Sequence, residues 1–172
     1  MGRDKSALRI DGVPMLERVV AAALAASMEV VVVGRKRPEW WRLDEVEFID
    51  EADHRGPLSG LEAALLHAAS DLILAACDMP RLSSAAFRWL ADASRESGAD
   101  GLVTLNGDRP EPLFSFYRQE SSWLVHELLS RDHRAMSELI AHGRFARASA
   151  PAWLRAELHN VNRPQDLERG DM

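Results

Sequence analysis

The stretch 71–80 constrains the fold more than any other part of the chain. Residues 72–77 are six apolar residues in a row, and Pro80 follows shortly after them. A short apolar run of this kind predicts a strand buried on both faces, as in the middle of a parallel sheet. The run ends directly on a carboxylate, Asp78. Ligands of open α/β sheets bind outside the carboxyl ends of the strands, so Asp78 is a candidate ligand-binding residue. The alternative is that it only begins the turn before Pro80.

Strand and helix patterns alternate through residue 98. Apolar runs at 29–34 and 46–49 predict two more strands, and apolar residues at helical spacing predict helices after Pro14, after Gly56 and after Ser83 or Ser84, the last ending at Gly98. This alternation predicts a parallel sheet with helices on both faces.

The second half of the chain predicts an addition to this sheet. A strand at 101–105 is followed by the hairpin signal Asn106-Gly107 and by a second strand at 112–117. The proline that opens the second strand favours an edge position, or a bend near a pocket. Helices at 119–130 and 134–142 and a late strand at 144–149 complete the pattern. We therefore expect a three-layer α/β/α, Rossmann-like fold with a mostly parallel sheet and an antiparallel strand, forming one domain over residues 1–172.

Composition excludes several classes of protein. The chain of 172 residues is long enough for one full core, and its net charge of −6 argues against a broad nucleic-acid-binding face. Its one cysteine, Cys77, lies in the apolar run and cannot form an internal disulfide, which favours a reducing cytoplasm. No stretch approaches the roughly 18 apolar residues of a membrane span.

Polar residues gather where the predicted strands end. The basic segment 34–37 follows one strand, and Asp50 and Asp78 follow two others. Carboxylate oxygens beside phosphates are the ligands that Mg²⁺ prefers, so these positions suit a magnesium–nucleotide site with Asp78 as the metal ligand. At the N-terminus, Gly2 permits close approach to a ligand and Lys5 supplies a charge suited to phosphate, although a frayed, solvated terminus is the alternative.

A glycine-bounded loop precedes the second predicted helix. It consists of Gly56, Pro57, Leu58, Ser59 and Gly60. Backbone N–H groups at a helix start bind anions, although an ordinary tight turn would have the same sequence. Taken together, the residues indicate a phosphate-handling α/β domain.

Four short segments in chain order resemble one known family, the molybdenum cofactor guanylyltransferases within the wider nucleotidyltransferase group. The Asp-Met-Pro and Gly-Pro-Leu-x-Gly elements are shared with neighbouring nucleotidyltransferases, whereas the C-terminal element is more specific. The segments are Met1-Gly-Arg-Asp-Lys5, Asp50 with Gly56-Pro-Leu-Ser-Gly60, Cys77-Asp-Met-Pro80 and Asn160-Val-Asn-Arg-Pro-Gln-Asp-Leu167.

The resemblance implies a function and a set of site residues. It implies transfer of GMP from GTP to the molybdopterin cofactor with Mg²⁺ as the metal, and molybdoenzyme chaperones as further partners. Lys5 and Asp78 would be catalytic, and Asp78 would bind the metal. The implied nucleotide-binding residues are Gly2, Arg3, Lys5, Asp50, Gly56, Pro57, Leu58, Gly60 and Asp78. Asn160 and Asn162, with the segment 112–117, would face the pterin.

The chain departs from the family pattern at its start. Members of the family open with a strand and a Leu-Ala-Gly-Gly loop before Met-Gly-x-Asp-Lys, and this chain begins after both. If it is complete as written, we expect a sheet that lacks an interior strand, together with weak GTP binding and little turnover. Two alternatives therefore stand beside the guanylyltransferase: a relative that uses CTP or a sugar phosphate, and a non-catalytic binding module.

Overall fold

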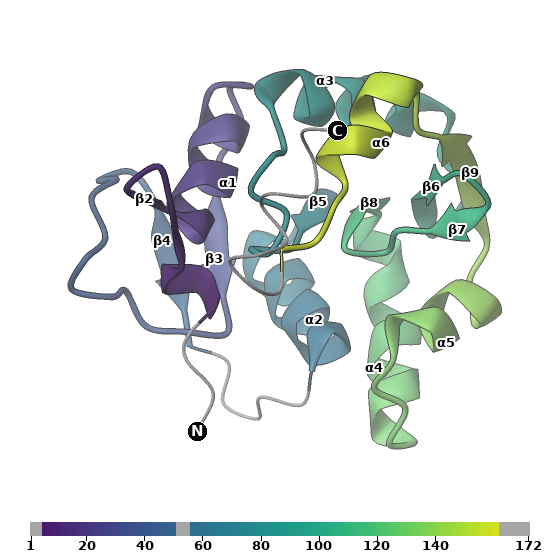
Figure 1. The fold of residues 1–172 in the computed structure, drawn as a ribbon. Coiled ribbons are helices and arrows are strands. Elements are labelled where there is room, and N and C mark those ends of the chain that lie inside the picture. The colour runs from purple at the N-terminus through teal and green to yellow at the C-terminus, as the bar shows by residue number, and fades with distance from the viewer. Residues whose placement is uncertain (1–4, 51–55, 162–172) are drawn as a thin grey trace.

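Strands enclosed between two layers of helices form the centre of the protein in the computed structural model, which describes residues 5–50 and 56–161 (Figure 1). One layer contains α1 (Met15–Leu24), α3 (Ser84–Ala93) and α6 (Ala152–Glu157). The opposite layer contains α2 (Pro57–Ala68), α4 (Ser122–Ser130) and α5 (Met136–His142). The predicted three-layer α/β/α fold is confirmed.

The main sheet has the order β5-β8-β6-β7, with β9 paired to β6. Its strands are β5 (Leu72–Ala75), β6 (Gly101–Asn106), β7 (Arg109–Pro110), β8 (Phe114–Tyr117) and β9 (Phe145–Ser149). Strand β8 is antiparallel to both β5 and β6, whereas β9 is parallel to β6. Strands β5, β6 and β9 therefore run in one direction. Strand β8 is the expected antiparallel strand, and β7 is antiparallel to β6 as well. Its predicted edge position is wrong, because β8 lies between β5 and β6.

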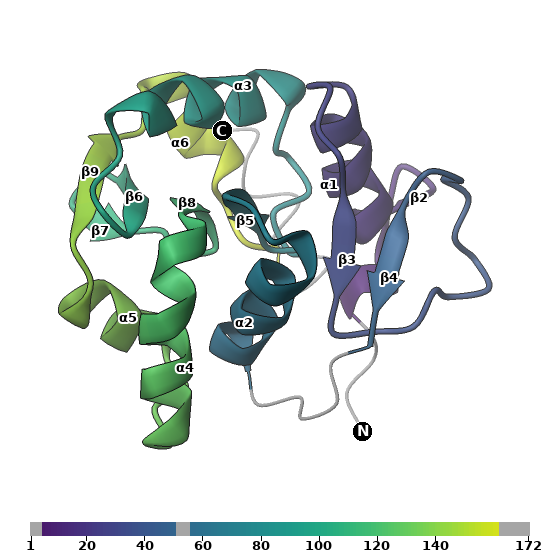
Figure 2. The same ribbon diagram turned by 180° about the vertical axis from the view of Figure 1, so that it is seen from behind.

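A second, parallel pair consists of β3 (Val31–Val33) and β4 (Glu47–Ile49). Among the described residues no backbone ladder joins this pair to β5, although α2 packs against both β3 and β5. Figure 2 shows the pair beside the main sheet and separate from it. Each residue of β5 is only half-buried. Both faces of the strand are nevertheless covered as predicted, because Ile73 and Ala75 pack against one core cluster and Leu72 and Leu74 against the other.

Local signals explain where several elements begin and end. The Asp11-Gly12 turn joins β1 (Arg9–Ile10) to β2 (Val13–Pro14), and α1 follows directly. Ser83 caps α3 by accepting a hydrogen bond from the N–H of Ala86 at 3.3 Å. Helix α3 ends before Gly98, because a 3₁₀ turn, η2 (Ser94–Glu96), follows it. Two more 3₁₀ turns complete the elements, η1 (Lys5–Ala7) and η3 (Gln119–Ser121).

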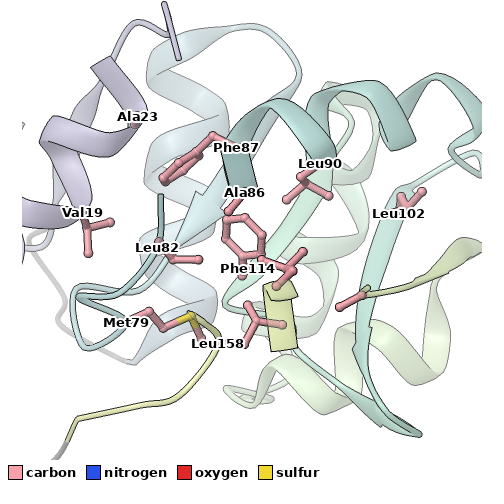
Figure 3. Packing of buried hydrophobic residues seen from close by; sticks show 12 residues of the cluster. Val19, Ala23, Met79, Leu82, Ala86, Phe87, Leu90, Leu102, Phe114 and Leu158 are labelled. Atoms are coloured by element: carbon pink, nitrogen blue, oxygen red, sulfur yellow. The ribbon is translucent and has the colours of Figure 1, made fainter. Parts of the chain in front are cut away.

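The core is divided by the sheet into two main clusters. On the α1–α3–α6 side, the rings of Phe87 and Phe114 meet edge to face at 5.5 Å, surrounded by Met79, Leu90 and other apolar residues (Figure 3). On the other side, the first three turns of α2 pack against α4, α5 and Tyr117. These clusters fix the end of β5 from both faces, and thereby position the residues that follow it. Among the described residues no helix is both long and apolar enough to cross a membrane.

Candidate nucleotide site

Asp78 lies in a short loop directly after β5, as the sequence predicts. Its backbone carbonyl accepts a hydrogen bond from the N–H of Val161 at 2.8 Å, which ties this loop to the C-terminal part of the chain. The side chain is half-buried, with its Oδ1 atom enclosed. Met79 and Pro80, which follow, are buried. The carboxylate is therefore held at the sheet edge by a well-anchored backbone.

Two other segments meet the Asp78 loop. The N–H of Ala76 donates to the carbonyl of Leu113 at 2.9 Å, which brings the turn before β8 alongside. From the opposite direction, Arg18 donates from Nε to the carbonyl of Pro80 at 3.4 Å and from Nη1 to that of Ile10 at 3.2 Å. Arg18 thus joins the N-terminal hairpin to the loop. The sequence did not single out this arginine, because its role depends on contacts across the fold.

The basic segment 34–37 and Asp50 lie together at the carboxyl ends of β3 and β4. Lys36 Nζ is 3.7 Å from Asp50 Oδ2, and both side chains are largely exposed. Arg35 reaches back to the hydroxyl of Ser6. Arg37 donates to the carbonyl of Val46 at 2.6 Å and lies over the ring of Phe48, so it supports the fold rather than a ligand. Asp50 is therefore paired with Lys36 at this edge.

The glycine-bounded loop is only partly suited to the predicted role. Gly56 is exposed, with φ at 99°, a conformation that favours glycine, and Pro57 opens α2 at a position where its missing N–H does no harm. Leu58 is fully buried, so its side chain packs in the core and does not contact a nucleotide. The N–H of Gly60 donates to the carbonyl of Gly56 at 3.3 Å. The start of α2 remains a candidate anion site through its first backbone groups alone.

Several predicted residues fall at the ends of the chain. Gly2, Arg3 and Asn162 lie outside the described residues. The backbone of Lys5 begins η1, but its side chain is likewise outside the description. Asn160 is exposed and directly precedes Val161, the residue bound to the Asp78 loop, so it lies close to this edge of the sheet.

Within the segment 112–117, which the resemblance places at the pterin, three side chains lie in the core. Phe114, Ser115 and Tyr117 are fully buried. The hydroxyl of Tyr117 donates to the carbonyl of Pro112 at 2.8 Å, and burial raises the pKa of this tyrosine. These side chains belong to the core, because β8 is an interior strand covered on both faces.

Glu111, which the sequence interpretation missed, lies in the turn before β8, at the same edge of the sheet as Asp78. The side chain is half-buried. Burial raises the pKa of the Glu111 carboxyl above its ordinary value of 4.5, and the negative charge of Asp78 raises it further, while Arg109 lowers it. The effect of Asp78 means that the two acids lie close enough to repel each other. Such a repulsion is relieved by a cation.

This electrostatic arrangement leads to a prediction about stability. Between pH 4.5 and the raised pKa, folded Glu111 holds its proton more tightly than the unfolded chain, so stability falls as pH rises through this range. Glu111→Gln removes the ionised form, and we expect it to stabilise the metal-free protein at neutral pH by up to about 1 kcal/mol. Thermal unfolding in EDTA at several pH values measures this. The gain should vanish below pH 4.5; a gain that is the same at every pH would contradict it.

The donor set at this edge fits Mg²⁺. No group of three or more acidic, histidine or cysteine side chains that could hold a metal exists within residues 5–50 and 56–161. Mg²⁺ does not require such a cage, because it is usually bound by one or two carboxylates together with waters and substrate phosphates. Two hollows of about 350 and 370 Å³ lie elsewhere, and neither is lined by a predicted site residue.

The described edge combines acidic side chains at strand ends with a helix start and nearby basic residues. This combination is typical of α/β proteins that bind nucleotides at the edge of the sheet. Comparison with known families agrees, since residues 1–148 match the model of the MobA-like NTP transferase domain. The chain belongs to this family of nucleotidyltransferases.

Individual relatives show how far the similarity extends. A protein of Opitutus terrae named probable molybdenum cofactor guanylyltransferase is 32% identical over 178 residues, covering 98% of this chain and 87% of the relative. Among solved structures, the molybdopterin-guanine dinucleotide biosynthesis protein A of Archaeoglobus fulgidus has a TM-score of 0.75 at 22% identity, covering 99% and 90% of the two chains. A 2-C-methyl-D-erythritol 4-phosphate cytidylyltransferase of Thermus thermophilus has a TM-score of 0.66 at 22% identity, covering 99% and 93%.

Proposed function

We propose that the protein transfers GMP from GTP to the molybdenum-molybdopterin cofactor, producing the guanine dinucleotide form and pyrophosphate. One observation carries this proposal, the similarity to the Opitutus terrae relative, which extends over 98% of the chain. The reducing cytoplasm is the setting that we propose, and molybdoenzyme chaperones are the partners that would receive the product.

The proposed roles follow the positions of the residues. Asp78 would hold Mg²⁺ at the end of β5, with nucleotide phosphates and water as the other ligands. Lys5 would contact the phosphates as a catalytic residue, with Gly2 and Arg3 beside it. Asp50 would lie in the nucleotide pocket at the end of β4. Asn160 and Asn162 would face the pterin, next to the segment that is tied to the Asp78 loop.

The proposed reaction places few demands on acid–base chemistry. A terminal phosphate oxygen of the pterin would form a bond to the α-phosphorus of GTP, while the bond from that phosphorus to the bridging oxygen breaks and pyrophosphate leaves with the electron pair. The nucleophile is already an anion, so the protein has to position the reactants and neutralise charge. Magnesium supplies positive charge to the phosphates. Asp78 would fix the metal position, and Lys5 would stabilise charge that develops on the leaving group.

A panel of nucleoside triphosphates tests this proposal. With Mg²⁺ and molybdopterin cofactor, we expect pyrophosphate release with GTP and about 5- to 150-fold less with CTP, ATP or UTP, since a base-reading contact is commonly worth about 1–3 kcal/mol. Preference for CTP would instead support the alternative of a cytidylyl transfer, which the structural similarity to the Thermus thermophilus cytidylyltransferase motivates. Binding of GTP without release under any condition would support the non-catalytic alternative.

A further inference from the structure

The backbone before β8 brings Glu111 to the same edge of the sheet as Asp78. The antiparallel register pairs Ala75, the last residue of β5, with Phe114, the first residue of β8. Beyond this pair the two chains continue side by side, as the hydrogen bond from Ala76 to Leu113 shows. Residues that follow β5 and residues that precede β8 therefore lie together, although they are far apart in the sequence.

The backbone of Glu111 is unusually well fixed. Its N–H donates to the carbonyl of Thr104 at 2.8 Å, and its own carbonyl accepts from the N–H of Phe114 at 3.0 Å. The same carbonyl accepts from the buried hydroxyl of Ser115 at 2.7 Å, and that hydroxyl accepts from the N–H of Thr104 at 3.1 Å. Bonds from two strands thus hold this turn, which is how rigid elements preorganise a functional side chain.

The side chain is not used to hold the fold together. Within residues 5–50 and 56–161, the carboxylate of Glu111 forms no hydrogen bond and no ion pair. It is half-buried in the turn before β8, and the Ala76–Leu113 hydrogen bond places this turn alongside the loop that carries Asp78. Acids placed in this way are commonly found at functional sites.

We propose that Glu111 is a second acidic residue of the metal site, whose carboxylate faces the cation that Asp78 holds. This inference rests on the function proposed above and adds a residue to its site. Two carboxylates, with phosphates and water, form the kind of donor set in which Mg²⁺ is bound in phosphate-transferring proteins. In the absence of the cation the two acids repel each other, and in its presence both are neutralised.

Binding of Mn²⁺, a paramagnetic substitute for Mg²⁺, tests the assignment without depending on catalysis. The loss of the free Mn²⁺ signal in electron paramagnetic resonance gives the Kd for the full chain and its variants. We expect Glu111→Gln to weaken Mn²⁺ binding by at least about tenfold, the scale seen when supporting residues of metal sites are lost. Glu111→Asp, which keeps the charge on a shorter side chain, should lie between this variant and the wild type.

Asp108 provides a matched control. It is an exposed acid in the β6–β7 turn, three positions before Glu111, and Asp108→Asn removes the same charge. This variant should bind Mn²⁺ as the wild type does. Equal Kd values for wild type and Glu111→Gln would overturn the assignment of Glu111 and leave the proposed function standing. If neither the wild type nor Asp78→Asn binds Mn²⁺, the assignment of a metal site to Asp78 is wrong, and so is the assignment of Glu111 to that site.

Discussion

Replacing Asp78 by asparagine is expected to lower GTP-dependent pyrophosphate release by at least about 100-fold, the scale of losing one preorganised electrostatic contact in a transition state. Asparagine keeps the shape of the side chain but removes the charge that binds the metal. The fold should survive, because the bond between Val161 and this loop is made by the backbone carbonyl of Asp78. Pyrophosphate release with Mg²⁺, measured together with circular dichroism, separates loss of activity from loss of structure.

Asp71 is the matched control for this substitution. It lies directly before β5, at the opposite end of the strand from Asp78, and its Oδ1 accepts a hydrogen bond from the N–H of Gln119 at 2.9 Å. Asp71→Asn should leave turnover unchanged, because only the end of the strand that carries Asp78 contains the site. Full activity of Asp78→Asn, or its unfolding, would show that this side chain is not the metal ligand.

Removing either of two buried hydroxyl groups near Glu111 should change the free energy of unfolding, but in different directions. The hydroxyl of Ser115 both donates to the carbonyl of Glu111 and accepts from the N–H of Thr104. Ser115→Ala leaves both backbone groups without this partner, and we expect it to lower the free energy of unfolding by about 2–3 kcal/mol. Urea unfolding followed by tryptophan fluorescence gives this value. The variant should also weaken Mn²⁺ binding, because the turn that carries Glu111 is loosened.

Thr104 is the contrasting case. Its side-chain hydroxyl is buried and has no hydrogen-bond partner in the part of the chain that the structure describes. Thr104→Val removes this unsatisfied group and keeps a β-branched residue inside β6, so the free energy of unfolding should stay constant or rise by about 1 kcal/mol. Equal destabilisation by Ser115→Ala and Thr104→Val would mean that packing, and not hydrogen bonding, determines the stability of this region.

Elements whose signals are local were predictable from the sequence. Each of these signals depends on a few neighbouring residues. They are the apolar runs of β3, β4 and β5, the Asp11-Gly12 and Asn106-Gly107 turns and the Ser83 cap. The position of Asp78 after β5 follows from the same kind of pattern. Propensity and turn chemistry act over short distances, so one sequence is enough to recognise them.

Features that depend on strand order were not predictable. The proline at 112 suggested an edge strand, but it lies in the turn before Phe114, and β8 itself is interior. The same pairing brings Glu111 to the edge of the sheet that carries Asp78. No local sequence pattern around Glu111 predicts this position. The position of Leu58 in the glycine-bounded loop predicts a residue that faces the ligand. Leu58 instead belongs to the first turn of α2, and its side chain packs in the core. Long-range pairing decides each of these cases.

The separation of β3 and β4 from the main sheet has a consequence for dynamics. Among the described residues this pair is attached through side-chain packing of α1 and α2, and not through a shared backbone ladder. Packing without such a ladder allows a subglobal opening whose free energy is lower than that of global unfolding. Amide protons of β3 and β4 should therefore exchange with solvent earlier than those of β6. The edge that carries Asp50 can loosen while the edge that carries Asp78 stays formed.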